Sequence, residues 1–136
     1  MLDLRAGFDF IGRSGHGDPA RLGLVALGAG GGAALEQAAD SRSGVKAVAL
    51  LWATLPPVDL AGRLNVPVLG LYGGADESVP AESVQAFAAA SAGRAEMLTY
   101  PGAGPDFADD ERSSFDQATA TDAWGRILAF LDTHLR

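Results

Sequence analysis

The stretch Arg21-Leu-Gly-Leu-Val-Ala-Leu-Gly28-Ala-Gly-Gly31 joins an apolar run to a cluster of glycines. The apolar run predicts a strand over residues 22–28, and its lack of alternation is typical of a strand buried on both faces. The glycines indicate a tight turn, and a helix is expected over residues 31–40. A buried strand that turns sharply into a helix is the repeating unit of α/β folds with parallel sheets.

The same pattern continues along the chain. An apolar run with β-branched residues predicts a strand over residues 45–52, and further strands are expected over residues 66–72 and 95–100. A short amphipathic helix is expected over residues 3–13 and another over 80–92. We therefore expect an α/β fold, a three-layer sandwich in which helices cover both faces of a short, mostly parallel sheet of about four strands.

Two long segments without strands complete the pattern. Residues 54–64 and 101–116 are expected to be loops. A last helix follows, and one of its sides is a stripe of apolar residues predicted to face the core. The stripe consists of Ala120, Ala123, Trp124, Ile127, Leu128, Leu131 and Leu135. No linker or repeat divides the chain, so residues 1–136 are expected to form a single domain.

Composition excludes several classes of protein. The net charge is −7, with 17 acidic against 10 basic residues, and no basic stripe offers a nucleic-acid surface. No apolar run reaches the ~20 residues of a membrane span, and the N-terminal residues do not resemble a signal peptide. The chain has no cysteine, which excludes thiol nucleophiles and zinc–thiolate sites. These features fit a cytoplasmic protein that interacts with neither nucleic acid nor membrane.

Acidic residues gather near the end of the chain. Such a run is typical of a solvated loop and helix start, and a divalent-metal site is the alternative interpretation. No spacing within it matches a known metal-binding loop, so no metal is predicted. The run consists of Asp106, Asp109, Asp110, Glu111, Asp116 and Asp122.

Four segments together resemble the dienelactone hydrolase family of α/β-hydrolases. Their order and spacing carry the resemblance, which extends from about Leu4 to Leu135. The resemblance implies a Cys or Ser, Asp and His triad in that chain order, and hydrolysis of small lactones and esters. The segments are Asp18-Pro-Ala-Arg-Leu-Gly23, Pro67-Val-Leu-Gly-Leu-Tyr-Gly-Gly-Ala-Asp76-Glu-Ser-Val-Pro80, Tyr100-Pro-Gly-Ala-Gly104 and Asp116 through Trp124-Gly-Arg-Ile-Leu-Ala-Phe-Leu131.

The resemblance places the triad on residues that cannot complete it. The nucleophile position, at the sharp strand-to-helix turn of the fold, falls on Gly28, which has no side chain. The acid falls on Asp76, which is present, and the base falls on Pro105. Where some members of the family have a substrate-holding arginine, this chain has Asp109. Ordinary acyl-enzyme hydrolysis is therefore not expected.

The chain's two histidines offer no replacement base. His16 precedes the strand that ends at the glycine turn, and seven residues at about 3.3 Å each place it roughly 20 Å from position 28. A general base must approach its proton to within about 3 Å. His134 closes the last helix, where a cation suits the helix dipole. We interpret both histidines as structural or surface residues.

The resemblance also implies that the family's N-terminal strands are missing from this chain. The strand at residues 22–28 would then be an exposed edge without a charged side chain, which folded proteins avoid because it templates aggregation. We expect a homodimer through residues 22–28. A separately encoded N-terminal half is the alternative partner, and the chain as an excised piece of a longer one is a third interpretation.

The glycines allow a second interpretation. Gly28-Ala-Gly-Gly-Gly-Ala33 satisfies the G-x-G-x-x-G/A fingerprint of dinucleotide binding, follows a strand and opens a helix. The next strand ends in Leu51-Trp-Ala-Thr54 and not in the Asp or Glu that would hold a ribose. We therefore predict no cofactor, and close packing of the helix on the sheet is the simpler role for these glycines.

Candidate site residues follow the ends of the predicted strands. Asp76 and Asp106 are tentative proton-transfer residues, since two neighbouring carboxylates can share a proton and acquire different pKa values. Local bonding of a turn is the structural alternative for Asp76, and core packing is the alternative for the aromatic residues below. The candidate ligand-binding residues are Gly28, Ala29, Trp52, Tyr72 and Asp109.

Three functions remain open. The leading hypothesis is a non-hydrolytic relative of dienelactone hydrolases that binds a small organic ligand or assembles as a dimer. The second is an enzyme in which Asp76 and Asp106 transfer protons on a small lactone, enone or polyketide-like substrate. The third is a scaffold subunit that completes another hydrolase half.

Overall fold

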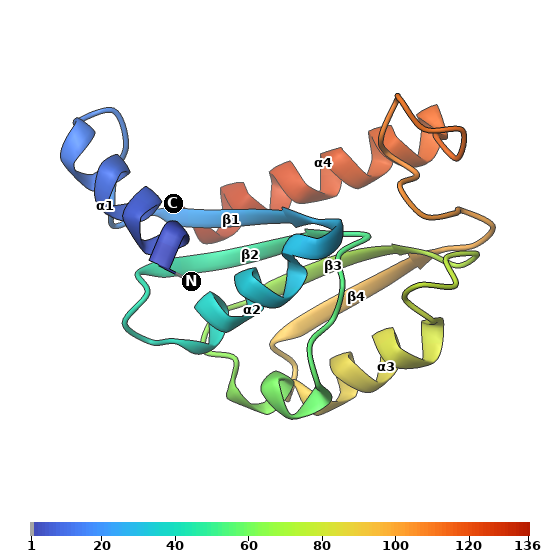
Figure 1. The fold of residues 1–136 in the computed structure, drawn as a ribbon, viewed down its shortest axis with the longest axis horizontal. Coiled ribbons are helices and arrows are strands. Elements are labelled where there is room, and N and C mark those ends of the chain that lie inside the picture. The colour runs from blue at the N-terminus through green and yellow to red at the C-terminus, as the bar shows by residue number, and fades with distance from the viewer. Residues whose placement is uncertain (1) are drawn as a thin grey trace.

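The computed structural model describes residues 2–136, with side chains from residue 4 onward. Strands and helices alternate along the chain, as the apolar runs predict (Figure 1). The elements are α1 (Leu2–Ser14), β1 (Leu22–Leu27), the 3₁₀ turn η1 (Gly28–Gly30), α2 (Gly31–Ala39), β2 (Val45–Leu51), the 3₁₀ helix η2 (Val58–Arg63), β3 (Val68–Gly73), α3 (Ala81–Ala90), β4 (Ala95–Tyr100) and α4 (Gln117–His134).

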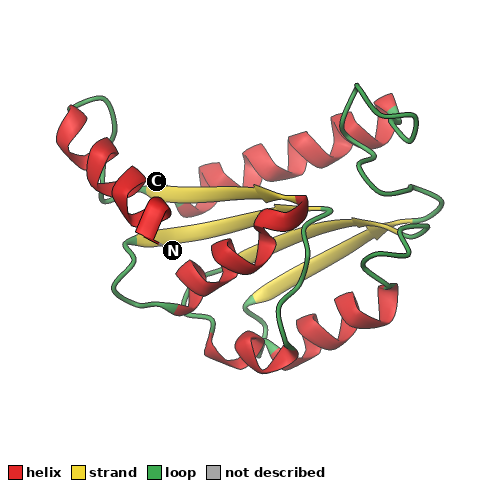
Figure 2. Cartoon of the chain, viewed as in Figure 1, coloured by secondary structure: helices red, strands yellow, loops and turns green. Residues whose placement is uncertain are grey.

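The four strands form one sheet in the order β1-β2-β3-β4, and all neighbouring pairs are parallel. Helices α2 and α3 lie on one face of the sheet and α4 lies on the other (Figure 2). The three-layer α/β sandwich predicted from the sequence is therefore confirmed. Because all strands run in one direction, the polypeptide leaves each of them at the same edge of the sheet.

Each face of the sheet carries its own hydrophobic core. On the α2 face, Leu35 and Ala38 of the helix pack with Val48 and Leu50 of β2, and all four side chains are buried. On the α4 face, a second cluster joins the helix to β2 and β3. Its buried members are Ala49, Leu51, Trp52, Leu69, Leu71, Phe107, Ala123 and Ile127.

Two local predictions were wrong. The segment predicted as a loop over residues 54–64 contains η2, whose Leu60 and Ala61 are buried against α2. The apolar stripe of α4 does not face the core throughout, because Trp124 is 38% exposed and Leu128 is 66% exposed. The residues of α4 that are buried against the sheet are Ala120, Ala123 and Ile127.

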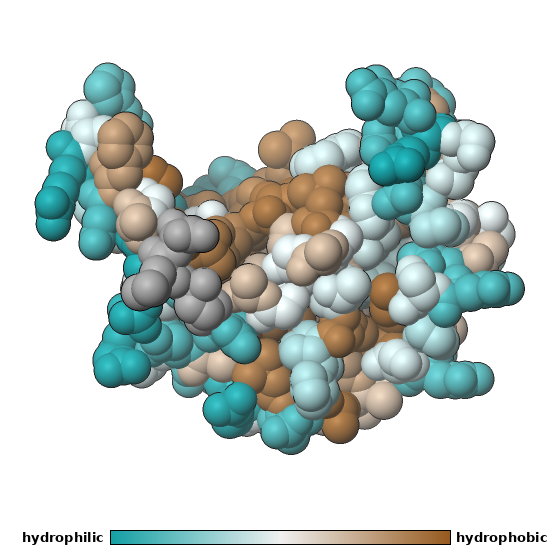
Figure 3. Space-filling view, viewed as in Figure 1, coloured by the Kyte–Doolittle hydropathy of each residue, from teal (hydrophilic) through white to brown (hydrophobic). Residues whose placement is uncertain are grey.

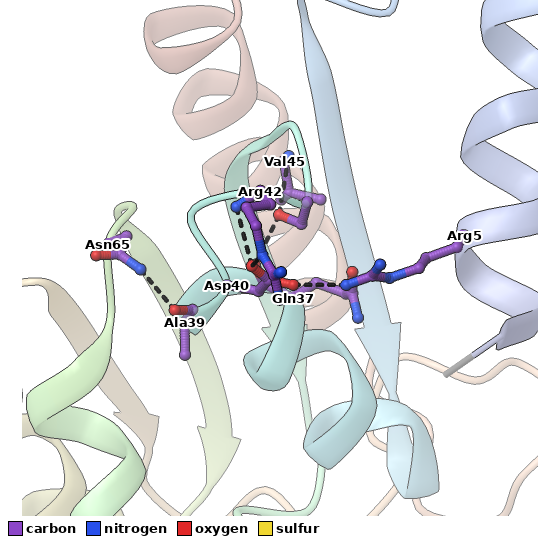
Figure 4. A network of polar contacts seen from close by, with 8 residues as sticks. Arg5, Gln37, Ala39, Asp40, Arg42, Val45 and Asn65 are labelled. Carbon is purple, nitrogen blue, oxygen red and sulfur yellow. Dashed lines mark hydrogen bonds and ion pairs between the residues drawn. The ribbon is translucent and has the colours of Figure 1, made fainter.

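Polar contacts fix the C-terminal end of α2 (Figure 4). The Arg5 guanidinium of α1 donates to the Asp40 carboxylate, which follows the last residue of α2, at 2.7 Å. The Asn65 amide donates to the Ala39 carbonyl at 2.6 Å, which satisfies a carbonyl that the helix end leaves free. Hydrogen bonds from the Arg42 backbone and side chain hold the pKa of Asp40 below its usual value. These contacts connect α1, α2 and the chain after η2.

No helix among residues 2–136 is both long and apolar enough to cross a lipid bilayer.

The start of α2 approaches the chain after β2 very closely. A Cβ atom at Gly31 would lie 2.0 Å from the Thr54 carbonyl oxygen and 3.0 Å from the Ala53 Cβ. A backbone carbonyl cannot rotate away as a side chain can, so this position requires glycine. Gly32, the next residue of the same helix, has no heavy atom within 4 Å of its Cβ position. The contact at Gly31 supports a packing role for this part of the glycine cluster.

Replacement of Gly31 by alanine is expected to destabilise the fold by about 1–3 kcal/mol, because α2 must move away from Thr54 to admit the methyl group. The matched variant Gly32→Ala is expected to raise stability by about 0.5–1 kcal/mol, since alanine favours the helix and meets no neighbour. Urea unfolding followed by circular dichroism measures both values. Equal effects of the two substitutions would contradict the close-approach explanation.

Candidate functional site

The positions singled out by sequence lie at the edge of the sheet where the strands end. Gly28 directly follows β1, Trp52 follows β2 and Asp76 lies three residues after β3. The loop of residues 101–116, with Pro105 and Asp106, follows β4. Ligands of parallel α/β proteins bind at this edge, where the loops converge. The fold therefore brings these segments to one side of the molecule.

The turn after β1 is a sharp strand-to-helix turn, and glycine occupies the position where the resemblance implies a nucleophile. Gly28 adopts a left-handed conformation with φ of 51°, between the end of β1 and the 3₁₀ turn that leads into α2. Its carbonyl accepts a hydrogen bond from the Thr54 N–H at 2.8 Å. A Cβ at this position would have the Trp52 Nε1 atom, at 3.8 Å, as its nearest neighbour, which is ordinary van der Waals contact. Space for a small side chain exists, and glycine leaves it without a reactive atom.

An aromatic cluster lies beside this turn. Trp52 is only 8% exposed, and its ring packs edge-on against Phe107 with centroids 5.5 Å apart. Phe107 is fully buried and also contacts the ring of Tyr100, at 5.4 Å. Trp52 itself has a φ of 43°, a backbone conformation that costs free energy for a non-glycine residue. The surrounding packing holds the indole in place against that cost.

Asp76 is buried and bonded within its own turn. Its carboxylate accepts hydrogen bonds from the Ser78 N–H, at 2.9 Å, and from the Ser78 hydroxyl. The turn is tied to the end of β4, because the Gly74 N–H donates to the Tyr100 carbonyl and the Ala75 N–H donates to the Ala103 carbonyl, both at 2.8 Å. In this arrangement Asp76 bonds the backbone of its own turn, which is the structural alternative that the sequence indicated for this residue.

Tyr72 lies in a different layer from Trp52. Its ring is fully buried with Val79 and Val84 beneath α3. Among the residues that the structure describes, none accepts or donates a hydrogen bond at its hydroxyl. Burial raises the pKa of this phenol, and the negative charge of Asp76 raises it further. Tyr72 is therefore a neutral phenol at physiological pH.

The remaining candidate residues, Asp106 and Asp109, lie in the loop after β4 and are not hydrogen-bonded to Asp76. Pro105 is exposed, and Asp106 is half-buried with φ of 57°. Asp109 accepts a hydrogen bond from the Glu111 N–H at 3.0 Å and pairs with Arg112 at 3.5 Å. Within residues 2–136, no hydrogen bond or ion pair joins Asp106 to Asp76, so the shared proton remains a prediction.

The histidines lie away from this edge. His16 is exposed in the turn between α1 and β1, at the opposite end of the strand from Gly28. His134 is exposed at the end of α4, and its ring packs edge-on against Phe130 with centroids 4.7 Å apart. Across the described part of the chain, no three His, Asp or Glu residues converge in a way that could hold a metal ion.

Sequence reasoning missed Phe107 and Thr54. Phe107 fixes the indole of Trp52, and Thr54 holds the glycine turn through its N–H and its carbonyl. A phenylalanine within the mostly polar segment 101–116 was the available signal for Phe107, although Phe115 in the same segment gives the same signal. Nothing in the sequence marks Thr54, because it acts through its backbone.

Removal of the Asp76 carboxylate by alanine is expected to lower the free energy of unfolding by about 1–3 kcal/mol, because the Ser78 N–H loses its buried acceptor. Ser78→Ala is expected to cost less, about 0.5–1.5 kcal/mol, since the backbone N–H still bonds the carboxylate. Chemical unfolding of both variants measures the difference. An Asp76→Ala protein as stable as the wild type would show that this turn does not depend on the carboxylate.

Comparison with known proteins agrees with this geometry. Residues 2–135 match the dienelactone hydrolase family. A protein of Methylorubrum extorquens named "Putative carboxymethylenebutenolidase" is 37% identical over 141 aligned positions, which cover 93% of this chain and 48% of that protein. A protein of the same name from Escherichia coli O157:H7 is 54% identical over 76 residues, 53% of this chain and 28% of that protein.

Solved structures show the same fold. The crystal structure titled as a putative dienelactone hydrolase from Klebsiella pneumoniae has a TM-score of 0.87 and 34% identity, covering 96% of this chain and 59% of that one. A dienelactone hydrolase-like phosphotriesterase from metagenomic libraries, at 19% identity, shares the fold with a TM-score of 0.83 over 98% of this chain and 60% of that one. Nearly all of this chain aligns with these relatives, but it spans only about half of their own length. With its α/β-hydrolase fold and its match over residues 2–135, the chain belongs to the dienelactone hydrolase family.

Proposed function

We propose that this chain is a non-hydrolytic member of the dienelactone hydrolase family that binds a small organic ligand without forming an acyl-enzyme. One observation carries the proposal: the residue at the turn after β1 is Gly28, and it has no atom that can attack a carbonyl. Nucleophilic catalysis needs such an atom and a base within hydrogen-bond reach of it. The exposed Pro105 occupies the position where the resemblance implies that base.

The residues around Gly28 favour binding of a small organic ligand over acyl transfer. The half-buried turn lies next to the Trp52 indole, whose Nε1 is 3.8 Å from the position of a Cβ at residue 28. An indole N–H can donate a hydrogen bond and an aromatic face can pack against a flat ligand. The relatives are named "Putative carboxymethylenebutenolidase". We therefore propose a small lactone or ester as the ligand, held at this edge and released unchanged.

The proton-transfer alternative has less support. Asp76 is buried, and Ser78 donates hydrogen bonds to its carboxylate from both its N–H and its hydroxyl. A carboxylate held in this way stabilises its turn and is poorly placed to exchange a proton with a ligand.

Incubation of the purified chain with a small unsaturated lactone is expected to quench tryptophan fluorescence reversibly and to leave the lactone unconsumed. The quenching should be lost in Trp52→Phe and retained in Trp124→Phe, which removes the chain's other tryptophan. Mass spectrometry should find no covalent adduct, since no nucleophile is present at position 28.

A burst of product from an activated ester, or a trapped acyl adduct, would overturn the proposal. Slow lactone turnover that disappears in Asp76→Asn would instead establish the proton-transfer alternative.

Introduction of a nucleophile at the turn provides the complementary test. Gly28→Cys creates the chain's only thiol, so any thiol modification reports on that position alone. The open space beside Gly28 predicts that p-nitrophenyl acetate acylates the variant in a single stoichiometric burst. Neither histidine lies at this edge of the sheet to activate water, so turnover should not follow. A Gly28→Cys protein that turns over many equivalents would show that a general base is already in place.

A further inference from the structure

The edge of the sheet where the strands end holds most of the charge of the chain. Residues 74–80, which follow β3, and residues 101–116, which follow β4, contain seven acidic residues and one basic residue, Arg112. They therefore carry −6 of the chain's net charge of −7. Arg112 is paired with Asp109. Figure 3 shows hydrophilic residues gathered on the loop before α4. A ligand that approaches this edge meets a negative field, which attracts cations and repels anions.

A buried carboxylate at this edge has one oxygen without a hydrogen-bond donor. Asp76 is only 4% exposed, and both hydrogen bonds from Ser78 end on its Oδ1 atom. Among the residues that the structure describes, none donates to Oδ2. Unlike the hydroxyl of Tyr72, this oxygen is not sealed from solvent. A donor from outside the protein can therefore reach the free oxygen of a charged group that is otherwise buried.

A buried donor at the same edge has no acceptor. Trp52 is 8% exposed, and its indole N–H makes no hydrogen bond within the described part of the chain. The nitrogen faces the turn of Gly28 and is open to solvent. The left-handed backbone of Trp52 holds the indole there at a cost in free energy, and such strain clusters at functional sites. The carbonyl oxygen of a small ligand is a suitable acceptor for this N–H.

The two unpartnered groups follow neighbouring strands. Trp52 directly follows β2, and its backbone N–H donates to the Leu71 carbonyl of β3 at 2.9 Å. Neighbouring strands lie about 4.8 Å apart, so a ligand the size of one ring can span them. The loop after β4 contacts both sides. Its Ala103 carbonyl accepts a hydrogen bond from the residue before Asp76, and its Phe107 ring packs against the indole.

We propose that the small lactone or ester bound at this edge carries a positively charged amino group. This inference rests on the proposed function and adds the charge of the ligand. The ammonium group donates to Oδ2 of Asp76, and the carbonyl of the same ligand accepts from the indole N–H of Trp52. The nitrogen keeps its proton, so no proton exchange with Asp76 is needed.

The charges around the site favour a cationic ligand over an anionic one. A hydrogen bond between an ammonium and a carboxylate is charge-assisted, and the acidic segments 74–80 and 101–116 add attraction at longer range. A ligand that bears a carboxylate would instead be repelled by these segments. Their one basic residue, Arg112, is already paired with Asp109 and is not free to hold it.

Three lactones that share one ring test the charge of the ligand. They are α-amino-γ-butyrolactone in its protonated form, uncharged γ-butyrolactone and the anion of γ-carboxy-γ-butyrolactone. The amino lactone is expected to bind about tenfold or more tightly than the uncharged one, because it gains one charged hydrogen bond. The carboxylate should bind about tenfold or more weakly than the uncharged one. The NMR shift of the Trp52 indole N–H, assigned with Trp52→Phe, follows each titration, and added salt should reduce the differences.

The uncharged lactone separates this inference from the proposed function. Equal affinity for the three lactones, or preference for the carboxylate, would overturn the charge inference and leave ligand binding intact. Binding of none of the three would overturn both.

Asp76→Asn tests the assigned contact. Asparagine keeps an oxygen that can accept from Ser78 but loses the charge, so affinity for the amino lactone is expected to fall by about tenfold or more. Glu77→Gln is the matched control, because it removes one charge from an exposed residue of the same turn and should change that affinity much less. Unchanged binding of γ-butyrolactone to Asp76→Asn shows that the site is still folded. Equal losses in the two variants, or full affinity of Asp76→Asn for the amino lactone, would overturn the contact with Asp76.

Discussion

The structure depends on the contact between the glycine turn after β1 and the backbone of Thr54. The Thr54 N–H donates to the Gly28 carbonyl, and its own carbonyl lies where only a glycine at position 31 can approach. This contact sets where α2 begins and ties it to the end of the neighbouring strand. It uses backbone atoms alone, so the left-handed turn is kept whether or not position 28 carries a reactive side chain. The backbone contacts that hold this turn do not depend on the side chain at position 28.

The same independence explains the rest of the candidate site. The indole of Trp52 is held by Phe107, and the carboxylate of Asp76 is held by Ser78, so both residues contribute to stability without any ligand. Positions that a hydrolase would use for catalysis lie here among contacts that hold loops together. These contacts order the edge of the sheet without any catalytic role, and that ordered edge is what our proposed ligand would contact.

Much of this fold could be predicted from local sequence. The strand over 95–100 was predicted at its observed bounds, and the other strands and helices within a few residues, because apolar runs and helical spacing are local signals. The stripe on α4 shows the limit of such signals. Periodicity identified the apolar side of the helix, but how much of that side the sheet covers depends on where α4 lies, so Trp124 and Leu128 were wrongly assigned to the core. Phe107 and Thr54 were missed because their roles arise from segments distant in the chain.

By itself, the sequence determined what the chain lacks and what its elements are. Glycine at position 28, proline at position 105 and the absence of cysteine are properties of single residues, so the proposal of a non-hydrolytic protein could be made before any folding was considered. Only the tertiary structure decided that Asp76 is bonded to its turn, that Trp52 meets Phe107, and that Trp124 and Leu128 of α4 stay exposed. These are contacts and exposures between segments far apart in the chain, and they exist only once the sheet and helices have packed.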